Sequence, residues 1–350
     1  MSLHRRKPKN WSGGRIGEPW AAVSLKKYRS IAFVIILLTV VSCAVWWNQI
    51  PRYQGKSARH WVGLLPRNET AARRALLELG TAGVPSLVDA ISVRQTWLEK
   101  KLEPLRSRLP RWIARQLLNP IEAEVRHQRA LKVLDELGPS AAPAIPALID
   151  LDCRVSEDFD FYSVPAQRVI LTIGEAGVPQ LIEVLRRGKD PAARAKAAMY
   201  LGQMGRSAAP GCDALAEALR DAGPEVRGAA VNALDQIGPL AAAALPALRA
   251  ALEMDNEDFR LRVVQALWDI GRDVKLTVPL LVKVLRDPQN PNRALAATTL
   301  ARMGPAAKAA APALSAVTQE QFSYTRVKAE EALKEIADPA AAAPGTEKSD

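Results

Sequence analysis

Five arginines recur at intervals of 33 residues, and each comes 11 residues before a position that is usually glycine. The arginines are Arg194, Arg227, Arg260, Arg293 and Arg326. The later positions are Gly205, Gly238, Gly271, Gly304 and Ala337. A period of this length is typical of stacked helix pairs. The sequence therefore predicts a chain made of structural copies rather than a fold wrapped around one pocket.

Each copy predicts a first helix ended by glycine and a second helix opened by proline. Leu234 and Ile237 stand four and one residues before Gly238, which places both on one face of a helix. We expect the glycine to take a left-handed backbone at the helix end, where a Cβ would be penalised. A proline then suits the first turn of the second helix. These prolines are Pro179, Pro210, Pro246, Pro279 and Pro312.

Equivalent positions from Gly80 to Ala337 give eight repeats, so we expect an all-α solenoid over residues 69–337. An insertion, 93–120, carries Trp and Leu at three-to-four spacing with Lys and Arg between them. This basic amphipathic segment either lies on an anionic bilayer surface or packs on the first repeats. From residue 338 the chain is rich in proline, alanine and charge, and residues 338–350 are expected to be disordered.

The repeat pattern resembles the HEAT family, in particular a bacterial branch named for phycobilisome lyases. Its motif, D-P-x-x-R-x-x-A-x-x-L-G, is fitted by Asp190, Pro191, Arg194, Ala197, Ala198, Leu201 and Gly202. The resemblance implies an α-α superhelix whose second helices generally line the concave surface. It leaves function open, since HEAT arrays serve as scaffolds, transport receptors, lyases and glycosylases. Residues 53–61 also resemble the N-terminal stretch of uncharacterised membrane-anchored bacterial HEAT proteins.

The N-terminus predicts a membrane anchor. Residues 1–30 hold eight Lys and Arg against one Glu, a net +7 of the total +11. Residues 31–47 carry no charge, and Asn48 to Ile50 extend the run to twenty residues, enough to span a bilayer. We expect a cytoplasmic tail (1–30), one inner-membrane helix (31–50, Ile31 to Ile50), a juxtamembrane linker (51–68) and a periplasmic repeat domain. A lipoprotein modified at Cys43 and a cleaved signal segment are the alternatives.

Composition disfavours two classes of function. Only +4 of net charge remains outside the first 30 residues, so no basic face for nucleic acid is expected. The chain has three histidines, His4, His60 and His127, and lacks the repeated His-Glu pairs of HEAT-type hydroxylases. We expect no catalytic residue, cofactor or metal. The prediction is a non-enzymatic scaffold for a protein partner; a chromophore lyase or a nucleic-acid-binding HEAT-like protein is the alternative.

Two sets of charged residues are candidates for function. The arginines of the ladder follow Asp190, Asp221, Asp258 or Asp287, and we expect structural ion pairs within or between repeats rather than ligand contact. Along the second helices, aligned acidic and basic positions predict a partner-binding column, with surface charges kept for solubility as the alternative. This charged column consists of Asp89, Asp150, Glu183, Arg186, Glu217, Arg220, Lys283 and Arg286.

Two smaller features have structural interpretations. Cys153 and Cys212 lie about two repeats apart, too far for a disulfide, and are expected to be buried or half-buried thiols. The acidic stretch from Asp150 to Asp160 lacks the glycine and ordered spacing of a calcium loop. A solvated acidic turn is expected there.

Overall fold

The computed structural model describes residues 51–92, 120–158, 163–254, 256–321 and 323–338. The expected transmembrane helix, most of the insertion and nearly all of the C-terminal tail lie outside these residues. Contacts separate the chain into the units 1–52 and 53–350, and the second contains the repeats. Among the described residues, one run, 69–92, is long and apolar enough to cross a membrane. It is broken at Gly80, where a first helix ends and a short connection begins.

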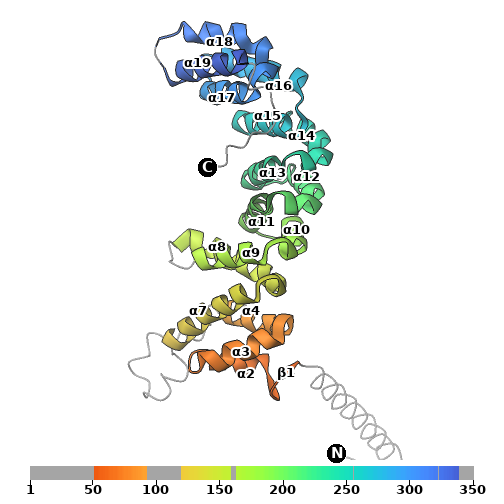
Figure 1. The fold of residues 1–350 in the computed structure, drawn as a ribbon, viewed down its shortest axis with the longest axis vertical. Coiled ribbons are helices and arrows are strands. Elements are labelled where there is room, and N and C mark those ends of the chain that lie inside the picture. The colour runs from red at the N-terminus through yellow and green to blue at the C-terminus, as the bar shows by residue number, and fades with distance from the viewer. Residues whose placement is uncertain (1–50, 93–119, 159–162, 255, 322, 339–350) are drawn as a thin grey trace, which may run out of the picture. The chain divides into compact units, whose positions relative to one another are not determined.

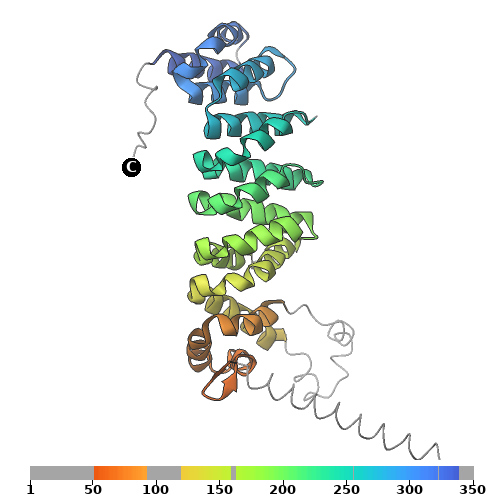
Figure 2. The ribbon, with the colours of Figure 1, turned by 90° about the vertical axis from the view of Figure 1, so that its right-hand side faces the viewer.

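The described repeats are helix pairs in two layers. The first helices are α3 (Glu69–Leu79), α7 (Pro120–Leu137), α9 (Ser163–Ile173), α11 (Pro191–Gln203), α13 (Pro224–Ile237), α15 (Glu257–Gly271), α17 (Arg293–Met303) and α19 (Tyr324–Ala337). The second helices are α4 (Val84–Ser92), α8 (Ile145–Asp158), α10 (Val178–Arg187), α12 (Cys212–Ala218), α14 (Leu245–Ala251), α16 (Val274–Arg286) and α18 (Ala311–Thr318). Figure 1 shows α11, α13 and α15 in one layer and α10, α12 and α14 in the other, and Figure 2 shows successive repeats stacked on one another. The fold is an α-solenoid, as the 33-residue period predicts.

Most helix pairs are joined by a 3-10 helix that begins at the expected glycine. These are η1 (Gly80–Gly83), η3 (Gly138–Ala144), η4 (Gly174–Gly177), η5 (Gly205–Gly211), η6 (Gly238–Ala244) and η7 (Gly304–Ala310). Each first glycine has a positive φ. At Gly238 φ is 72° and ψ is −141°, a combination open almost only to glycine. Positive φ is therefore confirmed at these six positions, with an extended ψ in place of the expected left-handed helical one at Gly238.

The α15–α16 connection corrects the expected role of Gly271. The α15 helix runs through Gly271, and the positive φ falls on Arg272 (52°). A Cβ on Gly271 would lie 2.9 Å from Leu245 Cδ2, so this glycine permits close packing instead of a turn. No 3-10 helix follows among the described residues of this connection, because Asp273 caps α16 directly.

The prolines divide according to these connections. Pro179, Pro246 and Pro312 occupy the second residue of α10, α14 and α18, as expected. Two positions differ from the prediction. Pro210 lies inside η5, before α12 begins. Pro279 lies inside α16, because that helix starts early, at Val274, once the 3-10 helix is missing.

Residues 51–68 are a folded cap, which corrects their assignment as a linker. They form the hairpin β1 (Arg52–Tyr53) and β2 (Lys56–Ser57), followed by α2 (Ala58–Leu64). Trp61 is 5% exposed and its indole N–H donates to the Tyr53 carbonyl at 3.3 Å. The α2 helix packs on α3 and α4. An array needs its terminal apolar surface covered, and the apolar side chains of α2 supply that cover.

The core of the repeats is two apolar clusters that meet on α15. The N-terminal cluster runs from Ala58 to Ile270 and the C-terminal cluster from Leu261 to Ile336. One side of α15 gives Val263 and Leu267 to the first cluster. Another gives Leu261, Val264 and Trp268 to the second. Because each repeat contacts mainly its neighbours, the apolar surface buried along the stack carries its stability.

Candidate functional site

The charged column lies on the layer of second helices, and all eight of its side chains belong to exposed residues. Asp89 is on α4, Asp150 is on α8, and Glu183 and Arg186 are on α10. The others follow along the same layer. Glu217 is on α12, Arg220 comes just after α12, and Lys283 and Arg286 are on α16.

Internal ion pairs neutralise the acidic half of the column. Arg186 holds Glu217 through two hydrogen bonds of 2.9 and 3.0 Å across α10 and α12. Glu183 accepts from Arg187 at 3.3 Å, one turn away on the same helix. Asp89 lies 3.6 Å from Arg59, and Asp150 pairs with Arg154. The basic half differs, since Arg220, Lys283 and Arg286 form no ion pair with the described residues.

The arginine ladder joins consecutive repeats. Arg194 on α11 donates to both carboxylate oxygens of Asp221, in the next repeat, at 2.8 Å, and to the Gly188 carbonyl at 2.9 Å. Both side chains are 15% exposed. The hydrogen bonds from Arg194 lower the pKa of the Asp221 carboxyl. Arg293 on α17 repeats the arrangement with the Leu285 carbonyl, at 2.9 Å, and with Glu320.

The other members of the ladder mostly bind backbone. Arg227 donates to the carbonyls of Asp221 and Ala222 at 2.8 and 3.1 Å, and Arg260 donates to Met254 at 3.4 Å. Arg326, on the last helix, pairs within α19 with Glu330. Each ladder arginine therefore has a structural partner. The expected ion pairs are confirmed for Arg194, Arg293 and Arg326. Arg227 and Arg260 instead bind backbone carbonyls.

The acidic stretch contains a buried polar cluster, which corrects the expectation of a solvated turn. Residues to Asp158 continue α8, and Asp152 is 3% exposed. Its carboxylate accepts from the Tyr200 hydroxyl at 2.8 Å and lies 2.9 Å from Lys196 Nζ. Tyr200 is fully buried, and burial is the main cause that raises its pKa. Asp152 is buried because α8 packs against α11, where both of its partners lie.

The two cysteines are free, buried thiols, as predicted. Burial raises the pKa of Cys153 to about 11, with the nearby Asp190 and Asp152 adding to the effect. Burial also raises the pKa of Cys212. Both thiols are therefore protonated at neutral pH and poor nucleophiles. Within the described ranges, no three His, Cys, Asp or Glu side chains lie close enough together to hold a metal ion.

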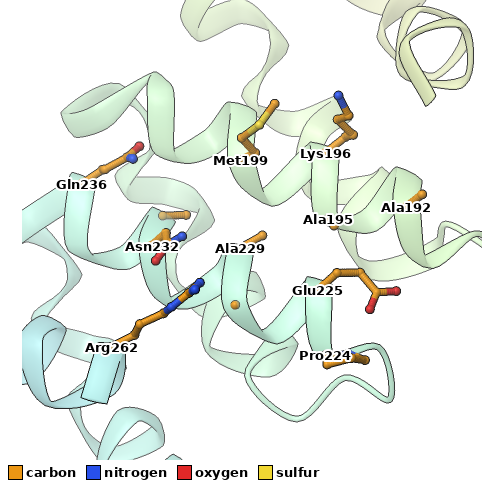
Figure 3. Close-up of a pocket in the computed structure, with 12 residues that line it drawn as sticks. Ala192, Ala195, Lys196, Met199, Pro224, Glu225, Ala229, Asn232, Gln236 and Arg262 are labelled. Atoms are coloured by element: carbon orange, nitrogen blue, oxygen red, sulfur yellow. The ribbon is translucent and has the colours of Figure 1, made fainter. Parts of the chain in front are cut away.

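An open groove on the layer of first helices is the other candidate site (Figure 3). It runs between α11 and α13, has a volume of about 520 Å³, and is reached by Arg262 from α15. Small and apolar side chains form its floor, with charged and amide groups along its walls. The lining residues are Ala192, Ala195, Lys196, Met199, Pro224, Glu225, Gly228, Ala229, Asn232, Ala233, Gln236 and Arg262.

Two glycines shape this groove. A Cβ on Gly202 would lie 2.9 Å from Ala233 Cα, so glycine at this position allows α11 and α13 to approach closely. Gly228 faces the groove, and the nearest atom to a Cβ there would be Nη1 of Arg262 at 3.6 Å. The guanidinium of one repeat therefore lies over the glycine of the preceding repeat.

Sequence reasoning placed no binding residue in this groove. The available signal was the run of small residues on successive first helices, at Ala192, Ala195, Gly228 and Ala229. On one sequence such residues also suit ordinary helix packing, so the signal does not separate the two roles.

A family model supports the repeat assignment over part of the chain. Residues 178–268 match the family model for HEAT repeats. No curated protein matches the chain. An engineered protein of solved structure is 20% identical, with a TM-score of 0.41, over 80% of this chain and 89% of that one. Human deoxyhypusine hydroxylase in complex with glycerol is 22% identical, with a TM-score of 0.26, over 74% of this chain and 99% of that one.

Proposed function

We propose that this chain, a HEAT-repeat protein, serves as a non-enzymatic protein-binding scaffold at the bacterial cell envelope. The observation that carries the proposal is the uninterrupted run of helix pairs from α9 to α18, which exposes charged side chains on one layer and an open groove on the other. Such extended surfaces suit partners that contact several repeats at once. The match to HEAT repeats supports a role in protein interaction rather than one particular enzymatic reaction.

The envelope location rests on the sequence of the first 50 residues. A basic segment followed by twenty residues without charge favours an anchor with its N-terminus in the cytoplasm. Protease added to intact spheroplasts should then digest an epitope placed after Tyr53 and spare one at Ser2. Digestion in the opposite pattern would contradict the envelope part of the proposal.

The charged column is the proposed contact surface on the second helices. Affinity capture of the full-length protein from membranes, with mass spectrometry, would supply a partner for a binding assay. The Glu183→Lys, Glu217→Lys double variant should weaken that binding, and the weakening by high salt expected for the wild-type complex should shrink in the variant, because the attraction that salt screens is lost. Its thermal stability should change little, because exposed ion pairs contribute about 0–1 kcal/mol.

A matched control separates charge recognition from loss of the Arg186–Glu217 pair. The swapped variant Arg186→Glu, Glu217→Arg keeps an ion pair across α10 and α12 and moves its charges. If the column is read by its charge pattern, the swap also weakens binding. Failure to capture any partner under conditions that preserve the fold would count against a scaffold.

A further inference from the structure

We propose that the groove between α11 and α13 binds an acidic segment of a partner protein, with a carboxylate held by Arg262 and apolar side chains seated on Met199 and the alanines. The proposal rests on the proposed scaffold function only in that the occupant is protein. It adds a second binding face, on the layer opposite the charged column.

The floor of the groove suits small and aliphatic side chains. Ala195, Ala229 and Met199 are half-buried and line a space of about 520 Å³. Gly202 allows α11 and α13 to approach closely at one end, and the lining residues follow both helices, so the groove is a furrow along their shared length. A furrow of this kind fits a run of side chains better than one compact small molecule.

Arg262 gives the groove its charge preference. Its side chain is exposed and forms no ion pair with any carboxylate of the described residues. The missing side chain at Gly228 lets the guanidinium lie over α13, at the groove. A guanidinium in this position can donate two parallel hydrogen bonds to one carboxylate. The ladder arginines donate hydrogen bonds to carboxylates or carbonyls of their own array. Arg262 differs from them because its guanidinium can still bind the carboxylate of a ligand.

The remaining polar groups favour the same occupant. Lys196 gives one contact to Asp152 and, with three N–H groups, retains donors for a ligand. Asn232 and Gln236 are exposed along α13 and make no side-chain hydrogen bond within the described residues. Their amides can pair with the backbone of a bound segment. Glu225 is the one acidic lining residue and lies at the N-terminal end of α13, so acidic side chains should bind away from that end.

The test is a titration of the full-length chain with three labelled 12-residue peptides. In all three peptides every second residue is apolar, either Ala or Leu. The remaining positions are Glu in the first peptide, Gln in the second and Lys in the third. Fluorescence anisotropy should show binding of the Glu peptide and at least tenfold weaker binding of the Gln and Lys peptides. Equal binding of the three, or no binding of the Glu peptide, would overturn the proposal.

Two variants locate the binding. Arg262→Glu should weaken the Glu peptide at least tenfold and strengthen the Lys peptide, and Gly228→Phe should block the groove. The control Gly63→Phe adds the same side chain to a helix glycine with open space, and Lys308→Glu reverses an exposed cation on η7, outside both the groove and the charged column. Both controls should bind the Glu peptide as the wild type does.

The variants also separate this inference from the scaffold proposal. If Gly228→Phe fails to fold by circular dichroism, Arg262→Glu decides the question alone. A Glu peptide whose binding is unaffected by Arg262→Glu, or is lost equally in Lys308→Glu, removes the groove as its site. A partner captured from membranes that is lost only in the column variants leaves the scaffold proposal standing without the groove.

Discussion

The α13 and α15 repeats lie next to each other and share one sequence pattern, yet they connect their two helices differently. After α13, Gly238 takes a positive φ and the 3-10 helix η6 leads into α14. After α15, Arg272 takes the positive φ and Asp273 caps α16 at once. The guanidinium of Arg272 lies 4.7 Å from the Trp268 ring centre, a contact that offsets part of its backbone cost.

The irregular connection coincides with the boundary between the two apolar clusters. The α15 helix belongs to both clusters, whereas α13 buries its apolar side chains in the first alone. A solenoid can tolerate a changed connection where neighbouring repeats exchange fewer core contacts. We infer that α15 is a joint between two stacks of repeats. Within each stack, a glycine of positive φ and a 3-10 helix connect the two helices of a repeat.

Core truncations on either side of α15 should have the largest effect. Leu234 and Leu300 stand four residues before Gly238 and Gly304, and both are fully buried, one in each cluster. Replacement by Ala should cost about 2–5 kcal/mol at each site, because a cavity remains. Hydrogen exchange in Leu300→Ala should accelerate over α16 to α19 and stay slow over α11 to α13. Leu234→Ala should show the reverse, and equal acceleration of both regions in either variant would refute the joint.

Much of this architecture could be predicted from local sequence. The 33-residue period, the apolar spacing before each glycine and the burial of both cysteines follow from helix periodicity and composition. The ladder arginines could be assigned structural roles because an aspartate precedes four of them by two to six residues, although the partner of each could not be predicted. These features repeat, so each copy supports the interpretation of the others.

The remaining features depend on contacts between distant residues. From the sequence, Asp152 is expected in a solvated acidic turn. Its burial depends on the packing of α8 against Tyr200, which is 48 residues away. Gly271 has the register of a helix stop, and only the position of Leu245 reveals its packing role. The groove likewise requires the spacing of α11 and α13, which one sequence does not specify.

A smaller effect should separate the two connections. Gly238→Val places a β-branched residue at φ 72° and should lower the free energy of unfolding by about 1–3 kcal/mol. Arg272→Gly removes a left-handed non-glycine residue, a gain of about 1–2 kcal/mol, and loses the contact with Trp268, a cost of about 0.5–1 kcal/mol. Urea denaturation should therefore show strong destabilisation in the first and a change within about 1 kcal/mol in the second. Comparable destabilisation in both would mean that the connections are equivalent.

The carboxyl pair of Asp235 and Asp269 links α13 to α15 and offers a pH-dependent comparison. Arg302 on α17 donates to Asp269 at 2.6 Å, and Asp235 Oδ1 is buried. Burial, followed by the charge of Asp269, raises the pKa of Asp235 to about 6. Asp221 in the regular ladder has its pKa lowered, chiefly by hydrogen bonds from Arg194. The two aspartates should therefore respond to pH in opposite directions.

Substitution of each aspartate by Asn should reveal these opposite signs. The folded protein holds the Asp235 proton more tightly than the unfolded chain, so its contribution to stability is present at low pH and is lost as pH rises from about 4 to about 6. Asp235→Asn should thus raise the free energy of unfolding at pH 7 by about 1 kcal/mol, after allowing for partial solvent exposure. At pH 4 the same substitution should change the free energy of unfolding little. Asp221→Asn should instead lower the free energy of unfolding at pH 7, with a loss that shrinks as pH falls below about 4, because Arg194 holds the ionised form. Chemical denaturation of both variants at pH 3, 4, 5.5 and 7 provides the test. If Asp235→Asn destabilises the protein at pH 7 as Asp221→Asn does, the carboxyl pair is a favourable contact between α13 and α15 and not a source of repulsion at the joint.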